Sequence, residues 1–435
     1  MSLYRLLYSL LWFVLSPFVL LRLFWRSRQN RAYRNNWQQR LGLINLEPAP
    51  RIWLHAVSVG ETMAAKPLIE ALLTQYPKHR LLLSNTTATG SQTAQRLFAN
   101  RVEHAYCPYD LPFAVSRFVK SAKPELLVIM ETEIWPNLIA SCHKQSIPVM
   151  IANARLSERS TKGYLRLSKL ITPALQQVSS IACRSEQDAN HFKQLGAKPE
   201  SIMLTGNIKF DILPKTQNSD AQALRQQLRP EAKIWVAAST HQGEDEQILA
   251  CYTQLKSQYP ELVLILVPRH PERFESVYQL CSHTQYAVQR RSESDVFNAN
   301  CDIILGDSLG EMARWYSAAD IVFMGGSLVP TGGHNPLEAS IYGIPVVSGP
   351  AIFNFNDVFD ILCSAEIAWV EADQHHLQTR ISGLLQLTDS ERQTIHLRAA
   401  QTLSQHRGVT DKLLSQINRL MDKQPISINQ AYTKP

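Results

Sequence analysis

Carboxylates follow two apolar stretches of the chain, at points where the strands of a parallel sheet would end. Residues 52–55 are largely apolar and lead through a glycine turn to Glu61, at the start of a helical stretch. Glu131 and Glu133 come directly after the apolar residues 126–130. A carboxylate within hydrogen-bond reach of an alcohol can accept its proton. Glu61 therefore predicts general-base chemistry, and Glu131 and Glu133 at the end of a buried strand predict chemistry in a cleft. Alternatively, Glu61 only complements a helix dipole, and the other two acids lie in a solvated loop.

Basic residues stand at further strand ends and predict contacts with an anion. Arg155 follows residues 149–152, Lys209 follows 202–205, and Arg269 follows 261–267. Arginine can bind a carboxylate or phosphate through two parallel hydrogen bonds, whereas lysine offers a compact charge. Lys209 alternatively pairs with Asp211, and the histidine and arginine at 270 and 273 alternatively act as ordinary polar partners.

Residues 324–350 carry the features of a phosphate site. They include two glycine pairs, at 325–326 and 332–333, after a short apolar run. Asn335 is a favourable N-cap and Pro336 suits the first helical position, so a helix is predicted to begin there. Glycines allow close approach of backbone N–H groups, and a helix N-terminus favours an anion. Glu338 would face the rest of the ligand; an ordinary loop of an α/β domain is the alternative.

Several motifs are missing from the chain. It contains no Asp-x-Asp pair, no GxxxxGK[ST] and no HExxH, so arginine, lysine and helix N-termini would have to stabilise a departing phosphate. The seven cysteines are scattered and form no CxxC, which indicates neither a zinc site nor a disulfide framework and favours a reducing compartment.

Apolar runs alternate with helical stretches, which predicts two doubly wound α/β domains with parallel sheets. The strands expected in the first domain are 52–55, 80–83, 102–106, 126–130, 149–152, 180–183 and 202–205. Those expected in the second are 234–238, 261–267, 302–305, 321–324, 345–348 and 367–370. Ligands of such sheets bind outside the carboxyl ends of the strands, so the chemistry is expected in a cleft between the two domains.

The domain boundaries follow from the same pattern. Residues 1–40 form an N-terminal membrane segment, 41–212 a first domain and 213–230 a polar linker that runs into a short helix. Residues 231–406 form the second domain, and 407–435 a helix long enough to cross back over the first domain, with a tail.

The N-terminal segment carries the excess charge. Residues 1–40 contain seven arginines and no lysine or acid, while the remaining residues contain 37 basic and 37 acidic side chains. The arginines are Arg5, Arg22, Arg26, Arg28, Arg31, Arg34 and Arg40. Because most of them follow the apolar run 6–21, they favour an anionic membrane surface over nucleic acid and place the body in the cytoplasm. A spanning anchor and an in-plane helix both remain open.

The motifs HAVSVGET, ETEIWPN, NARLS, GNIKFD, PRHPERF and GGSLVPTGGHNPLEA extend over both predicted domains. In these motifs the chain resembles the 3-deoxy-D-manno-octulosonic acid (Kdo) transferases, the lipid A glycosyltransferases of Gram-negative bacteria. The resemblance implies a GT-B architecture with an acceptor-binding first domain and a donor-binding second domain. It also implies transfer of Kdo from CMP-Kdo to lipid IVA with inversion, without a metal and without a cofactor.

The resemblance assigns roles to particular residues. Glu61 matches the proton acceptor of the family, and Glu131 and Lys209 match positions that stabilise the transition state. The CMP-contacting positions are Pro268, Arg269, Gly310, Glu311, Met312, Asn335, Pro336, Leu337 and Glu338. The implied partners are CMP-Kdo, lipid IVA and anionic inner-membrane lipids, at the cytoplasmic face of the bacterial inner membrane. A cytosolic nucleotide-sugar epimerase of GT-B type is the alternative enzyme, and a membrane-bound scaffold the non-catalytic one.

Overall fold

The computed structural model describes residues 2–26, 28, 35–212 and 219–422. The chain divides into two compact units, Met1–Ile212 with His406–Pro435, and Leu213–Gln405. The expected C-terminal tail, the first part of the expected linker, Arg31 and Arg34 lie outside the described residues.

Unit 1 is built on a parallel sheet of seven strands in the order β3-β2-β1-β4-β5-β6-β7. The strands are β1 (Arg51–His55), β2 (Arg80–Asn85), β3 (Glu103–Tyr106), β4 (Pro124–Met130), β5 (Val149–Ala154), β6 (Ser180–Cys183) and β7 (Ile202–Leu204). The central strands are buried on both faces, which is why they read as continuous apolar runs. Each of the seven expected strands is present, so the doubly wound α/β class is confirmed for this unit.

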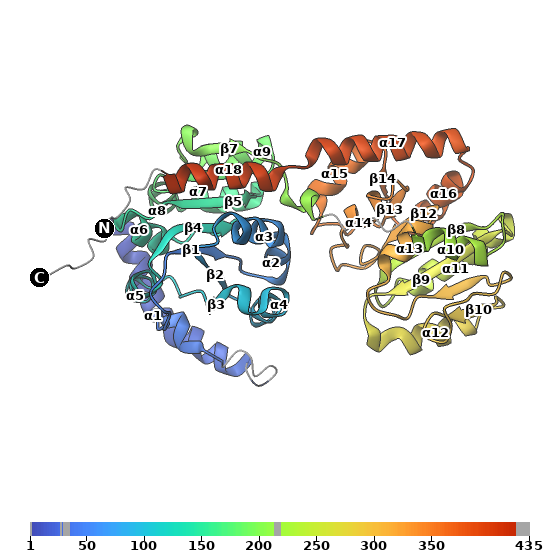
Figure 1. Ribbon diagram of the computed structural model, residues 1–435, viewed down its shortest axis with the longest axis horizontal. Helices are drawn as coiled ribbons and strands as arrows, with labels where there is room; N and C mark the ends of the chain where they lie inside the picture. The colour runs from blue at the N-terminus through green and yellow to red at the C-terminus, as the bar shows by residue number, and fades with distance from the viewer. Residues whose placement is uncertain (1, 27, 29–34, 213–218, 423–435) are drawn as a thin grey trace, which may run out of the picture. The chain divides into compact units, whose positions relative to one another are not determined.

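Helices cover both faces of this sheet (Figure 1). They are α2 (Val59–Ala64), α3 (Lys66–Gln75), α4 (Ala88–Phe98), α5 (Pro112–Ala122), α6 (Pro136–Lys144), α7 (Glu158–Leu165), α8 (Ser168–Leu175) and α9 (Glu186–Gln194). Short 3₁₀ turns are η2 (Trp37–Leu41), η3 (Ala99–Arg101), η4 (Pro199–Ser201) and η5 (Ile208–Asp211). The single helix expected over 61–76 is interrupted at Ala65, because Pro67 has no N–H for the carbonyl of Met63.

The last helix, α18 (Val409–Asp422), returns to unit 1. Its residues Val409, Leu413 and Ile417 are fully buried in the core beside β1 and β4. Asp211 fixes its start by accepting hydrogen bonds from the backbone N–H groups of Gly408 and Thr410, at 2.9 and 2.6 Å. The C-terminal helix therefore packs into the core of unit 1.

Unit 2 contains a second parallel sheet of seven strands, in the order β10-β11-β9-β8-β12-β13-β14. The strands are β8 (Lys233–Thr240), β9 (Leu262–Pro268), β10 (Val288–Arg290), β11 (Ile303–Leu305), β12 (Ile321–Met324), β13 (Val346–Ser348) and β14 (Ala368–Val370). The sequence misses β10, since this edge strand has three residues, two of them polar, and is only half-buried.

The helices of unit 2 flank this sheet (Figure 1). They are α10 (Ser219–Gln227), α11 (Asp245–Gln258), η6 (Pro271–Arg273), α12 (Phe274–Ser282), α13 (Met312–Ala318), α14 (Leu337–Ser340), α15 (Asn356–Ser364), α16 (Gln374–Leu385) and α17 (Asp389–His406). The short helix expected near the end of the linker is α10. It packs into unit 2 through the buried side chains of Leu224 and Leu228.

The N-terminal helix α1 (Leu3–Arg26) belongs to unit 1 and runs along its edge past α5 and α6 (Figure 1). It is longer than the apolar run that predicted it, and its length and composition would allow it to cross a membrane. Its exposed large apolar side chains are Leu3, Tyr4, Leu6, Leu7, Leu10, Leu11, Phe13, Val14, Leu15, Phe18, Leu21, Phe24 and Trp25.

Several contacts attach α1 to the rest of unit 1. The Nδ2 group of buried Asn137 donates a hydrogen bond to Ser9 Oγ at 3.1 Å. The ring of Trp12 stacks on that of Tyr109, with 5.9 Å between centroids. Phe24 lies 6.1 Å from the ring of Trp37, close to the other end of the helix.

Candidate active site

Glu61 lies in the first turn of α2, directly beyond the carboxyl end of β1. Its Oε2 atom accepts a hydrogen bond from the backbone N–H of Val57 at 2.7 Å. Its Oε1 atom accepts from the hydroxyl of Ser58 at 3.1 Å, while the Ser58 side chain caps the helix. This arrangement resembles a capping box, except that the glutamate accepts from the N–H of Val57, the residue before the cap, and it holds the carboxylate in one orientation at the sheet edge.

Burial is the main influence on the ionisation of Glu61. It raises the pKa of Glu61 to about 7, with the negative charges of Glu131 and Glu133 acting in the same direction. The hydrogen bond from Val57 opposes the increase. A carboxylate with a pKa near neutrality can take up and release a proton near pH 7.

Glu131 and Glu133 follow β4, the strand beside β1, so parallel pairing brings their loop to the same sheet end as Glu61. Glu131 has a φ of 59°, in the left-handed region that side chains with a Cβ rarely adopt. Such strain persists only when the surrounding structure imposes it, and it occurs mainly at functional sites. The solvated-loop alternative does not describe Glu133, whose pKa burial raises.

Lys209 lies in η5, which is attached to the end of β5. The Oδ1 atom of Asn153 accepts a hydrogen bond from the backbone N–H of Ile208 at 3.1 Å. Asn153 itself is fully buried and has a φ of 53°. Because β5 neighbours β4, this contact places Lys209 at the sheet end that also carries Glu61 and Glu131. Both carboxylate oxygens of Asp211, the alternative partner of Lys209, accept from the start of α18.

Arg155 contributes through its backbone in the described contacts. Its carbonyl accepts a hydrogen bond from the hydroxyl of Thr132, which joins the loop after β4 to the loop after β5. The predicted anion contact of its side chain stays a prediction.

In unit 2, Arg269 extends from the end of β9, where Pro268 is the last strand residue. Its backbone N–H donates to the carbonyl of Thr240 at 3.0 Å, which fixes it beside the end of β8. The Arg269 side chain is exposed, and its charge acts on both Glu338 and His334. These three side chains therefore gather at the carboxyl ends of the strands, and the phosphate site proposed for them stays a prediction.

Burial also controls the ionisation of this group. The Glu338 side chain keeps access to solvent, yet the surrounding protein raises its pKa, and Arg269 opposes the increase. Desolvation lowers the pKa of His334 to about 4, so this ring is neutral near pH 7. Its Nε2 atom lies 2.9 Å from Nε2 of His241, a distance at which one neutral ring donates and the other accepts.

The glycine loop after β12 is held by a residue to which the sequence assigned no role. Glu244 is fully buried, and its Oε1 accepts from the backbone N–H groups of Ser327 and Leu328 at 2.9 and 2.8 Å. Its Oε2 accepts from those of Gly326 and His241 at 2.6 and 2.8 Å. The position of Glu244 after β8 marked it as a possible site residue. Its role could not be predicted, because the loop that it binds is some 80 residues away in the chain.

Glycine at 325 is required by the close approach of two strand ends. A Cβ atom at this position would lie 2.5 Å from the carbonyl oxygen of Ser239, a residue that itself has a φ of 57°. The backbone of the β12 loop can therefore lie against the end of β8, where Glu244 binds it.

The helix predicted at 335 begins later than expected. It is the four-residue α14, with Pro336 at the N-cap and Leu337 as the first helical residue. Asn335 Oδ1 accepts a hydrogen bond from the backbone N–H of Leu337 at 3.2 Å, so the asparagine forms a turn one residue before the cap. The predicted start is wrong by one residue, and the predicted capping interaction by Asn335 moves with it.

Gly310, Glu311 and Met312 form the turn into α13, in which Glu311 is the N-cap and Met312 the first residue. The Glu311 carboxylate is paired with Arg291 at 2.7 Å and accepts from the hydroxyl of Ser308. It therefore organises its own turn. Arg273 likewise binds Asp245 and the carbonyl of Thr240, which agrees with the ordinary structural role considered for it.

Metal ligands do not gather in the described part of the chain: no three His, Cys, Asp or Glu side chains there form a group that could hold a metal ion. All seven cysteines are free, and six of them are buried in the two cores.

Two parallel α/β sheets with candidate residues at the carboxyl ends of their strands define a protein of GT-B architecture. Solved structures share this fold. A glycosyltransferase from Rickettsia africae has a TM-score of 0.57 at 11% identity, over 87% of this chain and all of that one. A UDP-GlcNAc 2-epimerase from Neisseria meningitidis has a TM-score of 0.56 at 12% identity, over 85% of this chain and 100% of that one.

Sequence relatives distinguish between these enzymes of the same fold. Residues 35–212 match the family described as 3-deoxy-D-manno-octulosonic-acid transferase (kdotransferase). The 3-deoxy-D-manno-octulosonic acid transferase of Haemophilus influenzae is 36% identical over 425 residues, which cover 97% of this chain and 99% of that protein. The chain belongs to the Kdo transferase family, and it is therefore a glycosyltransferase and not an epimerase.

Proposed function

We propose that the protein transfers Kdo from CMP-Kdo to a hydroxyl group of lipid IVA, with inversion at the anomeric carbon and without a metal ion. The observation that carries the proposal is the carboxylate of Glu61, oriented by Val57 and Ser58 at the end of β1 with a pKa raised to about 7. A sugar hydroxyl is a poor nucleophile until a base accepts its proton, and this carboxylate is suited to that task.

The proposed reaction is a single displacement. The acceptor oxygen forms a bond to the anomeric carbon of Kdo as its proton passes to Glu61. The bond from that carbon to the phosphate breaks, and its electron pair leaves with CMP. Glu131 and Lys209 stand at the same sheet end and would stabilise the charge that develops on the sugar and its carboxylate.

The donor side of the proposal rests on unit 2. Arg269 would bind the phosphate of CMP. Its side chain is exposed at the end of β9 and forms no ion pair with a described residue. Pro268, the turn at Gly310 and Met312, and residues 335–337 would contact the nucleotide around it. Glu338 would accept hydrogen bonds from the ribose hydroxyls. Glu311, being paired with Arg291, would shape the pocket through its turn.

We further propose that α1 lies in the plane of the inner membrane, at its cytoplasmic face. Contacts with unit 1 occur near both ends of the helix, at Tyr4 with Lys169 and at Phe24 with Trp37. This stretch of helix is about 30 Å long. A spanning helix would need the same length inside the hydrocarbon, where unit 1 cannot follow. The in-plane alternative is therefore favoured over the spanning one.

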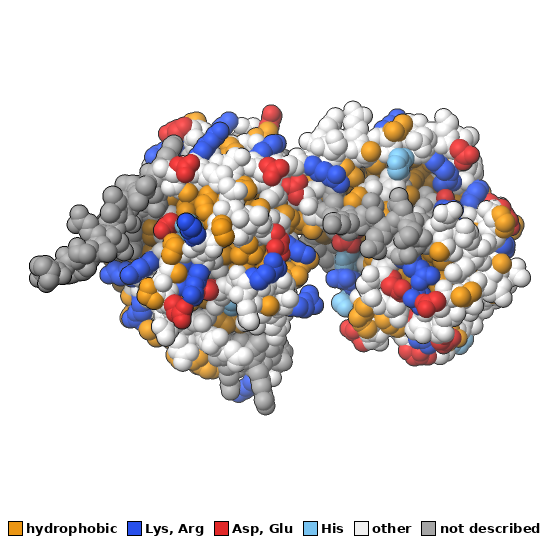
Figure 2. Space-filling model, in the orientation of Figure 1, with side chains coloured by type: hydrophobic (Ala, Val, Ile, Leu, Met, Phe, Trp, Pro, Cys, Tyr) orange, Lys and Arg blue, Asp and Glu red, His pale blue; other side chains and the backbone are white. Residues whose placement is uncertain are grey.

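A basic surface beside α1 supports this placement and an interaction with anionic lipids. Arg159, Lys162, Arg166 and Lys169 are exposed along α7 and α8, with the exposed side chains of Leu165 and Leu167 among them. Lys162 is paired with Glu158 at 2.7 Å. On the visible face of unit 1, Lys and Arg side chains lie among apolar ones (Figure 2). Interleaved basic and apolar side chains are typical of membrane surfaces.

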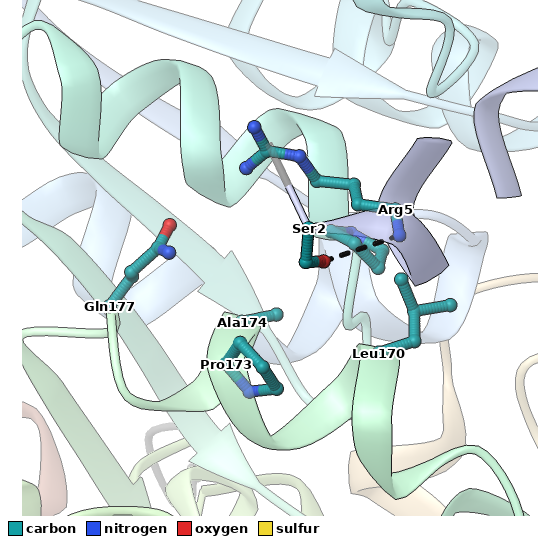
Figure 3. A pocket seen from close by; sticks show the side chains of 7 residues that line it. Ser2, Arg5, Leu170, Pro173, Ala174 and Gln177 are labelled. Carbon is teal, nitrogen blue, oxygen red and sulfur yellow. Dashed lines mark hydrogen bonds between the residues drawn. The ribbon is translucent and has the colours of Figure 1, made fainter. Parts of the chain in front are cut away.

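A pocket of about 270 Å³ joins the two parts of this surface. Ser2 and Arg5 of the N-terminal segment line it together with Leu170, Pro173 and Gln177 of the α8 region (Figure 3). Arg5 Nε and Gln177 Oε1 have no hydrogen-bond partner among the described residues. The phosphate of a lipid headgroup would provide an acceptor for the arginine.

The proposal is tested by incubating the purified protein with CMP-Kdo and lipid IVA in detergent. We expect release of CMP and a lipid product heavier by one or more Kdo residues, with equal rates in EDTA and in added magnesium. Absence of CMP above the uncatalysed background would refute the transferase reaction. A requirement for a divalent cation would refute the metal-free mechanism alone, and NMR of the product would establish the anomeric configuration.

A further inference from the structure

Arg40 is a buried cation without an acidic partner in the described part of unit 1. It lies in η2, its exposed fraction is 2%, and it forms no ion pair with any described residue. Its Nε atom also lacks a hydrogen-bond partner there. The guanidinium carbon lies 4.2 Å from the centroid of the Tyr106 ring. Burying a charge without a counter-charge is costly, so simple packing does not account for an arginine here.

The Arg40 side chain has polar contacts with Tyr109 and with the carbonyl of Thr86, and the second of these leads to the candidate base. Nη2 of Arg40 donates to the carbonyl oxygen of Thr86 at 2.8 Å. The backbone N–H of Thr86 donates to the carbonyl of Val57 at 3.2 Å. The N–H of Val57 in turn donates to Oε2 of Glu61 at 2.7 Å. Three hydrogen bonds thus connect Arg40 with the carboxylate of Glu61.

The opposite side of η2 is anchored to the sheet and to α1. The backbone N–H of Tyr109 donates to the carbonyl of Arg40 at 2.8 Å, and that of Tyr106 to Gln39 Oε1 at 2.8 Å. Trp37, the first residue of η2, contacts Phe24 of α1. Arg40 is therefore held through its backbone carbonyl, and its side chain contacts the loop beside Glu61.

We propose that Arg40 is a positioning residue for Glu61, acting through the backbone of Thr86 and Val57. The inference rests on the proposed role of Glu61 as the base. The guanidinium fixes the Thr86 carbonyl and with it the loop after β2. This loop holds Val57 in place, and the N–H of Val57 keeps the Glu61 carboxylate in one orientation. Arg40 also links the segment that follows the membrane helix to the catalytic carboxylate.

The hydrogen bond from Val57 is the strongest of the influences that lower the pKa of Glu61. Glu131 and Glu133, the charged groups that act on it from the loop after β4, both raise that pKa. His55, the last residue of β1, and His104, within β3, are neutral near pH 7, because burial lowers the pKa of each to about 4. Loosening the Val57 contact must therefore raise the pKa of Glu61 further.

The test compares Arg40→Gln and Arg40→Lys with the unchanged full-length protein, by following CMP release as a function of pH. For Arg40→Gln we expect kcat to fall at least tenfold and the acidic limb of its pH profile to move up by half a pH unit or more. KM for the donor should stay within twofold, since the donor residues lie in unit 2. Arg40→Lys keeps a donor and a charge, and it should recover part of the rate.

Arg117→Gln is the matched control. Arg117 is exposed and contacts η2 through the carbonyl of Leu41 at 3.5 Å, without any described contact to Thr86. This variant should keep the rate and the pH profile. An Arg40→Gln variant with an unmoved acidic limb would overturn the inference, whether its rate is normal or lowered by loss of folded protein.

Glu61→Gln in the same assay separates this inference from the proposed function. If Glu61→Gln remains active, the proposed base is wrong and the Arg40 inference fails with it. If Glu61→Gln is inactive while Arg40→Gln leaves the limb in place, the inference on Arg40 alone fails. Support requires an inactive Glu61→Gln variant, a moved limb in Arg40→Gln and an unmoved limb in Arg117→Gln.

Discussion

Glu61 combines two roles that a first-turn glutamate can have. It exchanges hydrogen bonds with the cap residue Ser58, which is a common structural task, and its pKa is raised to about 7 because burial and two further acids disfavour its charge. Glu61 does lie in the first turn of α2, where its charge complements the helix dipole. This position leaves the raised pKa unexplained, because a helix N-terminus alone would stabilise the charged form and lower the pKa.

We expect Glu61→Gln to reduce kcat by at least about 100-fold, the lower range for removal of a positioned base. Glutamine keeps the size and the contact with Val57 but cannot accept the proton. CMP affinity should be retained, as measured by calorimetry. Glu186→Gln, at an exposed first-turn glutamate behind a serine cap in α9, is the matched control and should keep full activity.

The pH dependence of the unchanged protein should follow the same carboxyl group. Glu61 acts as a base only when deprotonated, and its pKa is raised to about 7. The value of kcat/KM should therefore be constant above that pH and fall below it, about tenfold per unit. An acidic limb near the ordinary glutamate pKa of about 4.3 would contradict the assignment.

Glu131→Gln should move this limb in the opposite direction to Arg40→Gln. The negative charge of Glu131 raises the pKa of Glu61, so removing that charge must lower it. We expect the acidic limb to shift to lower pH while kcat also falls, since Glu131 is proposed to stabilise the transition state. A limb that stays in place would show that the two carboxylates do not interact in solution.

At the scale of elements, both sheets place polar side chains where strands end and use residues with positive φ to turn the chain there. Glu131 follows β4 and Asn153 lies near the end of β5, while Ser239 lies near the end of β8. In unit 2, Glu244 also binds the loop after β12 by accepting three backbone hydrogen bonds from it, and it accepts a fourth from the N–H of His241. The glycine loop is therefore preorganised.

Glu244→Gln should destabilise unit 2 and weaken donor binding together. Its amide nitrogen would face backbone N–H groups that now meet a carboxylate oxygen, and each buried donor left without a partner costs about 1–3 kcal/mol. We expect a lower urea midpoint and at least a fivefold weaker affinity for CMP. Glu272→Gln, at an exposed glutamate of the same unit, should change neither measurement.

At the scale of the whole molecule, the structure shows a second group of basic side chains besides those of residues 1–40. The arginines of residues 1–40 account for the net charge. In the region of α7 and α8, Arg159, Arg166 and Lys169 form no ion pair with a described residue, and Lys169 lies over the ring of Tyr4 in α1. The net charge conceals this cluster, because residues 41–435 contain as many acidic as basic side chains. The apolar face of α1 and the basic face of α7 and α8 together form the proposed membrane surface.

Binding to vesicles tests this surface. The double variant Leu11→Glu/Phe18→Glu should lose at least about tenfold in partitioning, since burying each such side chain contributes about 1.5–3 kcal/mol. Lys162→Glu/Arg166→Glu should weaken binding to anionic vesicles and leave binding to neutral vesicles unchanged. Leu397→Glu, at an exposed leucine of unit 2, is the control. Equal partitioning of all variants would place the membrane contact elsewhere.

Much of this protein was determined by local sequence. Burial on both faces makes parallel strands apolar, so thirteen of the fourteen strands could be predicted, and the polar residues at their ends could be proposed as site residues. The edge strand β10 could not be predicted, because its three side chains are only half-buried. Only the tertiary structure decided the rest, since each remaining feature joins residues far apart in the chain. Four features arise from such contacts: the positive φ of Glu131, the hydrogen bond from Arg40 to Thr86, the hydrogen bonds of Glu244 to the β12 loop and the raised pKa of Glu61. A pKa depends on which atoms exclude water and which charges lie close by, and the chain acquires those neighbours only when it folds.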